Sequence, residues 1–292
     1  MEHIVIEKLV TLCISRDIQL WKKNAPIILE KIESKQYDLV VPHNEVTLFK
    51  GITPIGINVI SEEAISPKIS AVKIRDLLPE RYKKKSGWYL QQILKIEALR
   101  SLTDDQVGLI WDSDTIPLKK LGFINSDKTL NYYVGQEFHP DYFATNNKLV
   151  NIGKVAKFSF ISQCFPIYGG NLKALIQLIE SSGAGPWYEI VAKNLQGSSD
   201  MSFSEYELMG SYLFNSALKS MRFLDNPWSR DGRRIIKSYR NLNHNFLQGL
   251  SDRYDFIAVE GGLYSSNHAF YIDKLKNILF SRFRDLKLAN RK

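Results

Sequence analysis

The sequence predicts an α/β fold in which helices flank a mainly parallel sheet, and three observations support this class. Short apolar runs at 9–14, 38–42 and 57–60 alternate with a helical pattern, as in units where a helix connects parallel strands. The 292 residues, 44% of them hydrophobic, are enough to bury one large core. No linker rich in Gly, Pro or Ser interrupts them. We therefore expect a mainly parallel sheet, flanked by helices, that takes ligands at the carboxyl ends of its strands.

Local patterns give the first elements in order. Residues 9–14 form a continuous apolar run that is typical of a buried strand. The segment 15–17 follows as a loop and helix cap, and the helical pattern extends over 19–34. Residues 38–42 and 57–60 predict the second and third strands. This strand-helix-strand order is the basis of the fold prediction.

Two further helices are expected before and after the middle of the chain. The basic run 81–85 predicts a loop that is either solvated or guides a phosphorylated substrate. Ser86 is a candidate cap for the helix that follows, and Leu90 and Ile93 belong to its apolar stripe. The second helix is expected over 171–181.

The segment 106–117 carries the strongest functional signal. A short apolar run ends in two carboxylates, Asp112 and Asp114, and Pro117 ends the segment. Residues i and i+2 of a strand point to the same face, so both carboxylates can reach one hard divalent cation that substrate phosphates complete. The alternative is a strand end followed by a solvated Asp turn. The context favours a metal-diphosphate site, which the loop 15–17 would meet at the same sheet edge.

Composition narrows the class of protein. No stretch approaches the roughly 20 apolar residues that span a bilayer, and the first residues lack the order of a signal peptide, so we expect a cytoplasmic protein. Cys13 and Cys164 both lie in apolar runs, and two such thiols cannot build a disulfide framework or a zinc cluster.

Much of the net charge of +8 lies at the C-terminus, where residues 273–292 hold seven basic and two acidic side chains. Apolar residues at helical spacing predict a basic amphipathic helix over 271–292. This helix either contacts an anionic membrane surface or packs its apolar stripe on the domain. Nucleic acid is not an expected partner, because no recognised nucleic-acid-binding signature accompanies the charge.

Several motifs together resemble a known class of enzyme. They are the helix motif 87–92, the central segment 111–117, and the aromatic and acidic segments 137–143 and 203–207. Over about residues 8–215 the chain resembles bacterial GT-A glycosyltransferases, and more narrowly a poorly characterised family from surface-polysaccharide gene clusters.

The resemblance implies one domain of the GT-A-like (Rossmann-like) fold over 1–270, with a C-terminal helical extension. Its nucleotide-binding half would span about 1–120 and its acceptor-binding half about 121–270. The implied activity is metal-dependent transfer of a sugar, of the hexosyltransferase type, to a glycan or lipid-linked acceptor of lipopolysaccharide or capsule. The implied cofactor is Mn²⁺ or Mg²⁺, and the commonest donor would be a UDP-sugar. The work would occur at the inner face of the cell membrane.

The resemblance also implies roles at the metal. Asp114 would bind the metal directly, and Asp112 would hydrogen-bond the ribose or hold the metal through water. In many such folds a histidine near the C-terminus is a further ligand. The candidates here are His268, which is preferred, and His244.

Other binding residues are expected around these carboxylates. A guanidinium group contacts phosphate oxygens in bidentate fashion, so the arginines after Trp228 either clamp a diphosphate or form a basic turn. Aromatic residues suit the apolar faces of sugar rings, although most aromatics pack in cores. The residues expected at the nucleotide-sugar are Ser15, Arg16, Asp17, Gln91, Asp112, Arg230 and Arg233. The residues expected at the acceptor are His139, Tyr142 and Trp187.

An inverting transfer needs a carboxylate that takes the proton of the acceptor hydroxyl. Glu205 is the candidate, with Glu207 behind it. Both would lie in a helix that begins near Ser204, where residues two apart do not share a face. A retaining enzyme would need no such base, and the sequence leaves the stereochemistry open.

Three other hypotheses compete with a glycosyltransferase function. A haloacid dehalogenase-type phosphatase also uses an Asp-x-Asp motif, but on the first strand of its domain, whereas about 100 residues of α/β pattern come first here. A sugar nucleotidyltransferase would carry a Gly-rich loop after the first strand, where this chain has 15–17. A non-catalytic carbohydrate-binding protein is the third alternative, which the absence of metal-dependent nucleotide-sugar binding would favour.

Overall fold

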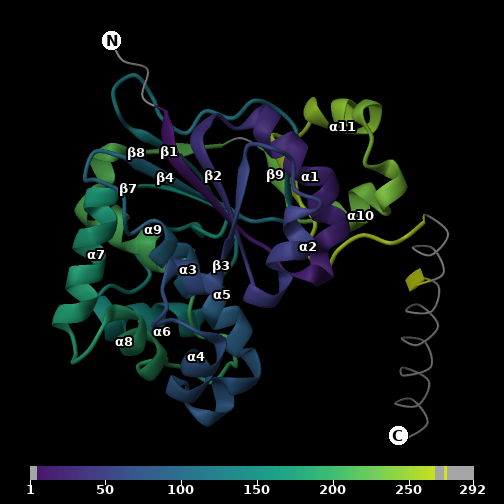
Figure 1. Ribbon diagram of the computed structural model, residues 1–292. Helices are drawn as coiled ribbons and strands as arrows, with labels where there is room; N and C mark the ends of the chain where they lie inside the picture. Colours follow the sequence, from purple (N-terminus) through teal and green to yellow (C-terminus); the bar gives the residue numbers. More distant parts are fainter. Residues whose placement is uncertain (1–4, 226, 267–272, 275–292) are drawn as a thin grey trace, which may run out of the picture.

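A computed structural model describes residues 5–225, 227–266 and 273–274, with a five-stranded sheet at the centre (Figure 1). The strand order is β3 (Ile57–Ser61), β2 (Ser34–Val41), β1 (Ile6–Leu12), β4 (Val107–Trp111) and β7 (Cys164–Tyr168). The first four strands are parallel, and β7 is antiparallel to β4. The predicted mainly parallel sheet is confirmed.

Two small sheets extend this core. One has the order β5 (Thr115–Pro117), β10 (Phe256–Ala258) and β9 (Trp228–Ser229), and the other pairs β6 (Leu130–Tyr133) with β8 (Met221–Leu224). Because β10 pairs with β5, the end of the described chain runs beside the Asp-x-Asp segment, and the Val259 amide donates to the Asp114 carbonyl oxygen at 2.8 Å. The predicted division near residue 120 stays a prediction.

Helices cover both faces of the central sheet. The α-helices are α1 (Ile18–Lys31), α2 (Val46–Lys50), α3 (Glu62–Ile65), α4 (Ala71–Leu77), α5 (Ser86–Ala98), α6 (Pro140–Val150), α7 (Gly169–Ser181), α8 (Trp187–Lys193), α9 (Glu205–Ser216), α10 (Gly232–Ile236) and α11 (His244–Ser251). The 3₁₀ helices are η1 (Ser15–Asp17), η2 (His43–Glu45), η3 (Glu80–Lys85), η4 (Leu218–Ser220) and η5 (Tyr239–Asn241). None of the helices within the described ranges is long and apolar enough to cross a membrane.

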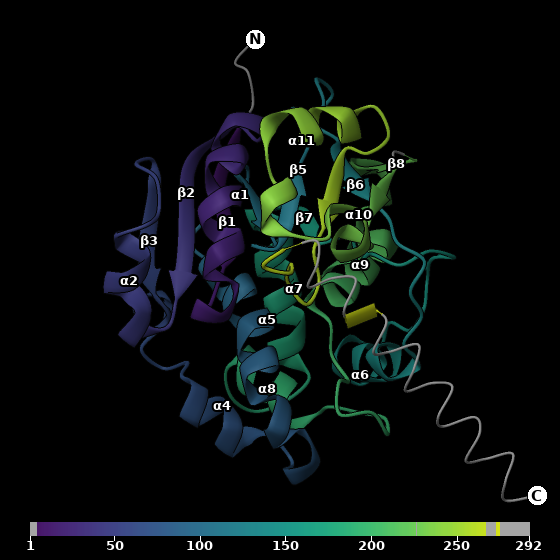
Figure 2. The ribbon, with the colours of Figure 1, turned by 90° about the vertical axis from the view of Figure 1, so that its right-hand side faces the viewer.

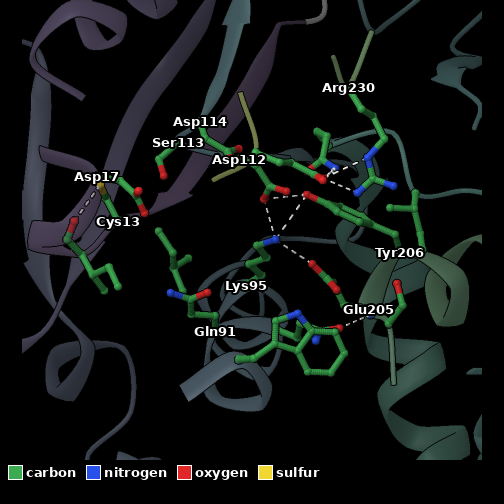
Figure 3. Close-up of a pocket in the computed structure, with 18 of the residues that line it drawn as sticks. Cys13, Asp17, Gln91, Lys95, Asp112, Ser113, Asp114, Glu205, Tyr206 and Arg230 are labelled. Atoms are coloured by element: carbon green, nitrogen blue, oxygen red, sulfur yellow. Dashed lines mark hydrogen bonds and ion pairs between the residues drawn. The ribbon is translucent and has the colours of Figure 1, made fainter. Parts of the chain in front are cut away.

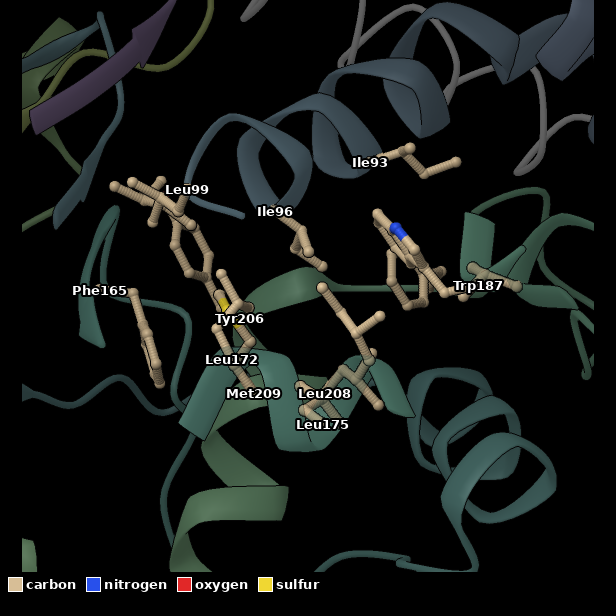
Figure 4. Packing of buried hydrophobic residues seen from close by; sticks show 14 of the residues in the cluster. Ile93, Ile96, Leu99, Phe165, Leu172, Leu175, Trp187, Tyr206, Leu208 and Met209 are labelled. Carbon is tan, nitrogen blue, oxygen red and sulfur yellow. The ribbon is translucent and has the colours of Figure 1, made fainter. Parts of the chain in front are cut away.

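Alternate residues of the strands pack into two different cores, as the period of a strand requires. Leu9 and Leu109 pack with Trp21 of α1, which lies in front of the sheet in Figure 2. Val10 and Ile110 belong to the opposite core, which α5, α7 and α9 complete. Figure 4 shows the side chains of these three helices packed together. Further helices, α4, α6 and α8, lie beyond the end of the sheet towards which β2 points (Figures 1 and 2).

The predicted elements differ from the observed ones mainly at their ends. The first helix ends at Lys31 rather than 34, because β2 begins at Ser34. The basic run is the 3₁₀ helix η3 rather than a loop, and Ser86 is the first residue of α5 and not its cap. Both cysteines are buried and free, as expected. Of the predicted helix over 271–292, only 273–274 lie within the described residues.

Candidate active site

The topology brings two polar segments to one edge of the sheet. β1 and β4 are parallel neighbours with Val10 opposite Ile110, so η1, which follows β1, and the Asp-x-Asp segment, which follows β4, lie side by side. They line a pocket of about 230 Å³ (Figure 3). α5, α9 and the segments around Glu137, Arg230 and Glu260 form its other walls. The predicted meeting of these segments is confirmed.

Asp112 is held by two side chains that come from different helices. Lys95 of α5 lies 2.5 Å from its Oδ1 atom, and the Tyr206 hydroxyl of α9 donates to the same oxygen at 2.9 Å. Burial and the Asp112 carboxylate raise the pKa of Tyr206 well above its usual range, so this hydroxyl stays protonated. One oxygen of Asp112 is thus already occupied by protein donors.

Lys95 links Asp112 to the candidate base. Its Nζ also lies 2.7 Å from Oε1 of Glu205, and its side chain is only 12% exposed. Burial alone would lower the pKa of Lys95, but the carboxylates of Asp112 and Glu205 together raise it above its usual range. A largely buried ammonium group therefore bridges the buried carboxylate of Glu205 and the partly exposed carboxylate of Asp112 (Figure 3).

Asp114, unlike Asp112, is not held by other side chains of the described residues. Its carboxylate has no hydrogen-bond or ion-pair partner among the residues that the structure describes. Burial raises the pKa of the Asp114 carboxyl from 3.8 to about 7. The carboxylates of Asp112, Glu260 and Asp17 act in the same direction. The pocket thus contains a carboxylate that lacks a counter-charge.

Asp114 and its neighbour Asp112 are the residues of this pocket that could hold a divalent cation. Mg²⁺ or Mn²⁺ is commonly held by one or two carboxylates while waters and substrate phosphates complete its coordination. Within 5–225, 227–266 and 273–274, however, no three Asp, Glu, His or Cys side chains form a ready-made metal cluster. His268 lies outside the described residues. His244 begins α11 and lines a separate hollow, so it is not at this pocket.

The two glutamates of α9 point in different directions, as helical geometry requires. Ser204 caps the helix by accepting from the Glu207 amide. Glu205 lines the pocket and is buried, which raises its pKa, whereas Lys95 opposes that rise. Glu207 does not line the pocket, because its Oε1 accepts a 2.6 Å hydrogen bond from Ser159. Of the two expected catalytic residues, only Glu205 lines the pocket, and its catalytic role stays a prediction.

The structure places some of the residues expected at the nucleotide-sugar at the pocket and others away from it. Arg16, Asp17 and Gln91 line the pocket. Ser15 does not, since its hydroxyl donates to the Glu45 carboxylate at 2.6 Å. Ser15 therefore lies away from the pocket in this conformation, and its contact with a nucleotide stays a prediction.

The two arginines of the expected clamp are also separated. Arg230 lines the pocket and pairs with the carboxylates of Glu137 and Glu260, and its Nε lies 2.9 Å from Glu260. Arg233 lies over the ring of Tyr264, with 4.4 Å to the ring centroid, and is not at the pocket. Of these two arginines, only Arg230 therefore lines the pocket.

The aromatic expectations also need a correction. Tyr142 lines the pocket and stacks on Trp88, with 6.3 Å between centroids. The His139 ring packs against the Tyr142 ring, with 4.7 Å between their centroids, but His139 does not line the pocket. Trp187 is 0% exposed, and its indole nitrogen donates to Glu97, so this ring packs in the core and cannot contact an acceptor in this conformation.

Sequence reasoning missed the residues that join the elements. On α5, the missed residues Trp88 and Lys95 lie three positions before and four positions after Gln91, which was expected at the site, and this spacing places all three on one helix face. That spacing was the available signal, because a lysine on an otherwise apolar helix needs a partner. Glu260 gave no such signal, since only the pairing of β10 with β5 brings it near Asp114.

A comparison of sequences identifies the family of this chain. The sequence matches the model of a family of unknown function, DUF6492, over residues 29–238, and the chain belongs to this family. No curated protein is similar to it in sequence.

Solved glycosyltransferases are distantly similar in structure. Mouse xyloside xylosyltransferase 1 in its apo form is 12% identical with a TM-score of 0.46, covering 88% of this chain and 98% of that one. The galactosyltransferase LgtC with donor and acceptor sugar analogues is 8% identical with a TM-score of 0.40, covering 87% of each chain. The glycosyltransferase GlyE of Streptococcus pneumoniae TIGR4 is 11% identical with a TM-score of 0.40, covering 95% of this chain and 64% of that one. Likenesses of this degree carry no argument about activity.

Proposed function

We propose that this protein is a metal-dependent glycosyltransferase that moves a sugar from a nucleotide-sugar donor to a glycan or lipid-linked acceptor. The observation that carries the proposal is the pocket at the carboxyl ends of β1 and β4. There Asp114 lacks a counter-charge, while the nearby Asp112 is fixed by Lys95 and Tyr206. A divalent cation with a diphosphate would supply both the missing charge and the remaining oxygen ligands.

The donor end of the pocket is assigned to these carboxylates. Asp114 would bind the metal directly, and Asp112 would bind the ribose or the metal through water with the oxygen that Lys95 leaves free. When bound, Mn²⁺ or Mg²⁺ neutralises charge on the departing diphosphate. Arg230 would exchange a carboxylate partner for a phosphate oxygen, since its guanidinium already faces the pocket.

Glu205 is assigned the proton transfer of an inverting reaction. Its carboxylate lies in the pocket, and its raised pKa makes it a better base than an exposed glutamate. Lys95 opposes that rise, because its ammonium group favours the ionised carboxylate. If the transfer instead retains configuration, Glu205 would position the donor sugar together with Lys95.

The biological setting is proposed from the sequence resemblance alone. It points to lipopolysaccharide or capsule biosynthesis, with a UDP-sugar as the commonest donor and the inner face of the cell membrane as the place of work. The segment 271–292 would supply the contact with anionic lipid.

Binding of metal and nucleotide tests the proposal directly. We expect Mn²⁺ together with one nucleoside diphosphate to raise the melting temperature of the purified protein, because a ligand bound only by the folded state stabilises it. Asp114→Ala should lose this shift, whereas Asp252→Ala, which removes an exposed carboxylate at the end of α11, should keep it. A shift with phosphate mimics and Mg²⁺ but with no nucleotide would favour the phosphatase alternative.

The phosphatase alternative has less support in the fold. Its nucleophilic Asp belongs to the first strand of the domain, whereas Asp112 follows β4, after β1, β2 and β3. The nucleotidyltransferase alternative requires a Gly-rich loop after the first strand, where η1 lies here. The non-catalytic alternative is separated from the proposal by the nucleotide-binding experiment.

A further inference from the structure

A second hollow adjoins the candidate active site. It has a volume of about 560 Å³, within the range of about 300–1,000 Å³ that small-molecule sites occupy. Glu137 and Arg230 line both the hollow and the pocket that holds Asp112 and Asp114. The two spaces therefore share a wall, and a ligand in the hollow would lie next to the proposed donor site.

The hollow has an aromatic surface that is fixed before any ligand binds. The Trp228 indole nitrogen donates to the Val134 carbonyl oxygen at 2.8 Å, and its ring stacks on Phe256 with 5.4 Å between centroids. Phe158, on the lining as well, is held by Phe223 at 4.8 Å. Rigid aromatic faces of this kind bind apolar faces of a ligand without an ordering cost.

The charges of the residues that line this hollow disfavour an anionic ligand. Glu137 and Asp225 bring two carboxylates, and Arg230 is the only basic side chain among the described lining residues. That guanidinium is already paired with Glu137 and with Glu260. The hollow is therefore net acidic, and a carboxylated sugar would meet repulsion there, whereas hydroxyl groups can bond to Asp225 and to the exposed Gln136.

We propose that this hollow binds an uncharged sugar ring of the acceptor. The inference rests on the proposed function, because it takes the neighbouring pocket as the donor site. Apolar faces for stacking and acceptors for hydroxyl groups are the two features that a pyranose requires, and the hollow has both. Arg230, in the shared wall, would contact the donor diphosphate on one side and the acceptor on the other.

The test uses the full-length protein and simple glycosides as probes. Methyl glucopyranoside, methyl galactopyranoside and methyl glucuronide are titrated by saturation-transfer NMR, and binding of UDP with Mn²⁺ is measured on the same samples. We expect the two neutral glycosides to bind at least tenfold more tightly than the glucuronide. Gln136→Trp, which fills the hollow from an exposed position, should weaken neutral glycoside binding at least tenfold. Gln248→Trp on α11 is the matched control and should not change it.

A second variant keeps the test decisive if Gln136→Trp folds poorly. Asp225→Lys reverses one lining charge and should strengthen glucuronide binding at least tenfold. The inference would be overturned if neutral glycosides bound Gln136→Trp as tightly as they bind the wild-type protein. It would also be overturned if the glucuronide bound the wild-type protein more tightly than it binds Asp225→Lys. Failure of UDP and Mn²⁺ to bind would instead overturn the proposed function, while displaceable glycoside binding would still support a sugar site in the hollow.

Discussion

Removing the charge of Asp114 should stabilise the metal-free protein while it abolishes metal binding. Asp114→Asn keeps the shape of the side chain and replaces a carboxylate that has no partner among the described residues. The pKa of this carboxyl rises from 3.8 to about 7, so the folded state holds an ionised Asp114 at a cost. A difference of about three in pKa corresponds to about 4 kcal/mol, because one pKa unit is about 1.4 kcal/mol. Asp114 is partly exposed, and screening by solvent reduces the expected gain to about 1–3 kcal/mol.

The sign of the effect depends on pH. A carboxyl whose pKa is higher in the folded state binds its proton more tightly there, so this contribution to stability falls as pH rises from about 4 to about 7 and then levels off. The Asn variant lacks the titration. Its advantage over the wild type should therefore be near zero at about pH 4 and complete at about pH 8.

Urea unfolding in the presence of EDTA, at pH 5 and at pH 8, measures this difference. Asp112→Asn is the matched control and should be destabilised, because Lys95 and Tyr206 both lose the charge to which they bind. The reasoning would be wrong if Asp114→Asn were less stable than the wild type at pH 8, or if its advantage did not grow with pH.

Three further substitutions test other parts of the site. Lys95→Met leaves the buried carboxylate of Glu205 and the partly exposed carboxylate of Asp112 without their cation. Urea unfolding should therefore show a loss of about 3–5 kcal/mol, and a loss below about 1 kcal/mol would contradict the bridging role. Glu205→Gln should slow sugar transfer by about 10²–10⁴ in an assay of product formation, whereas Glu207→Gln should lower the melting temperature and leave transfer largely intact. Trp187→Ala should cost about 3–5 kcal/mol of stability in the same unfolding assay without weakening nucleotide binding; weaker binding at unchanged stability would place this ring in the site after all.

The parts of the fold that sequence predicted are those set by local periodicity. Apolar runs gave β1 and β2 because the second half of each strand is buried on both faces and is therefore continuously apolar in sequence. The edge strand β3 was found from its apolar residues, although they are only partly buried. The Asp-x-Asp segment was placed at the sheet edge because its carboxylates directly follow such a run. Glu205 was placed in the first turn of a helix by the cap at Ser204.

The parts that sequence did not predict depend on contacts between distant segments. Lys95 pairs with residues that are 17 and 110 positions away, and no local pattern encodes those distances. The burial of Trp187 depends on how α8 packs against α5 and α7. Its residue type alone did not reveal this packing, and Trp187 was therefore expected to contact a sugar. The observed ends of helices differ from the predicted ones for the same reason, because tertiary packing decides where a helix stops.

Nucleotide release from a panel of nucleotide sugars is the measurement that tests the central claim most directly. The full-length protein is incubated with each donor and Mn²⁺, with and without a mixture of glycan acceptors, and free nucleoside diphosphate is quantified. We predict Mn²⁺-dependent release from one class of donor, abolished by EDTA and by Asp114→Ala and preserved in Asp252→Ala. Release from no donor, or release that Asp114→Ala leaves unchanged, would contradict the assignment of this pocket to metal-dependent sugar transfer.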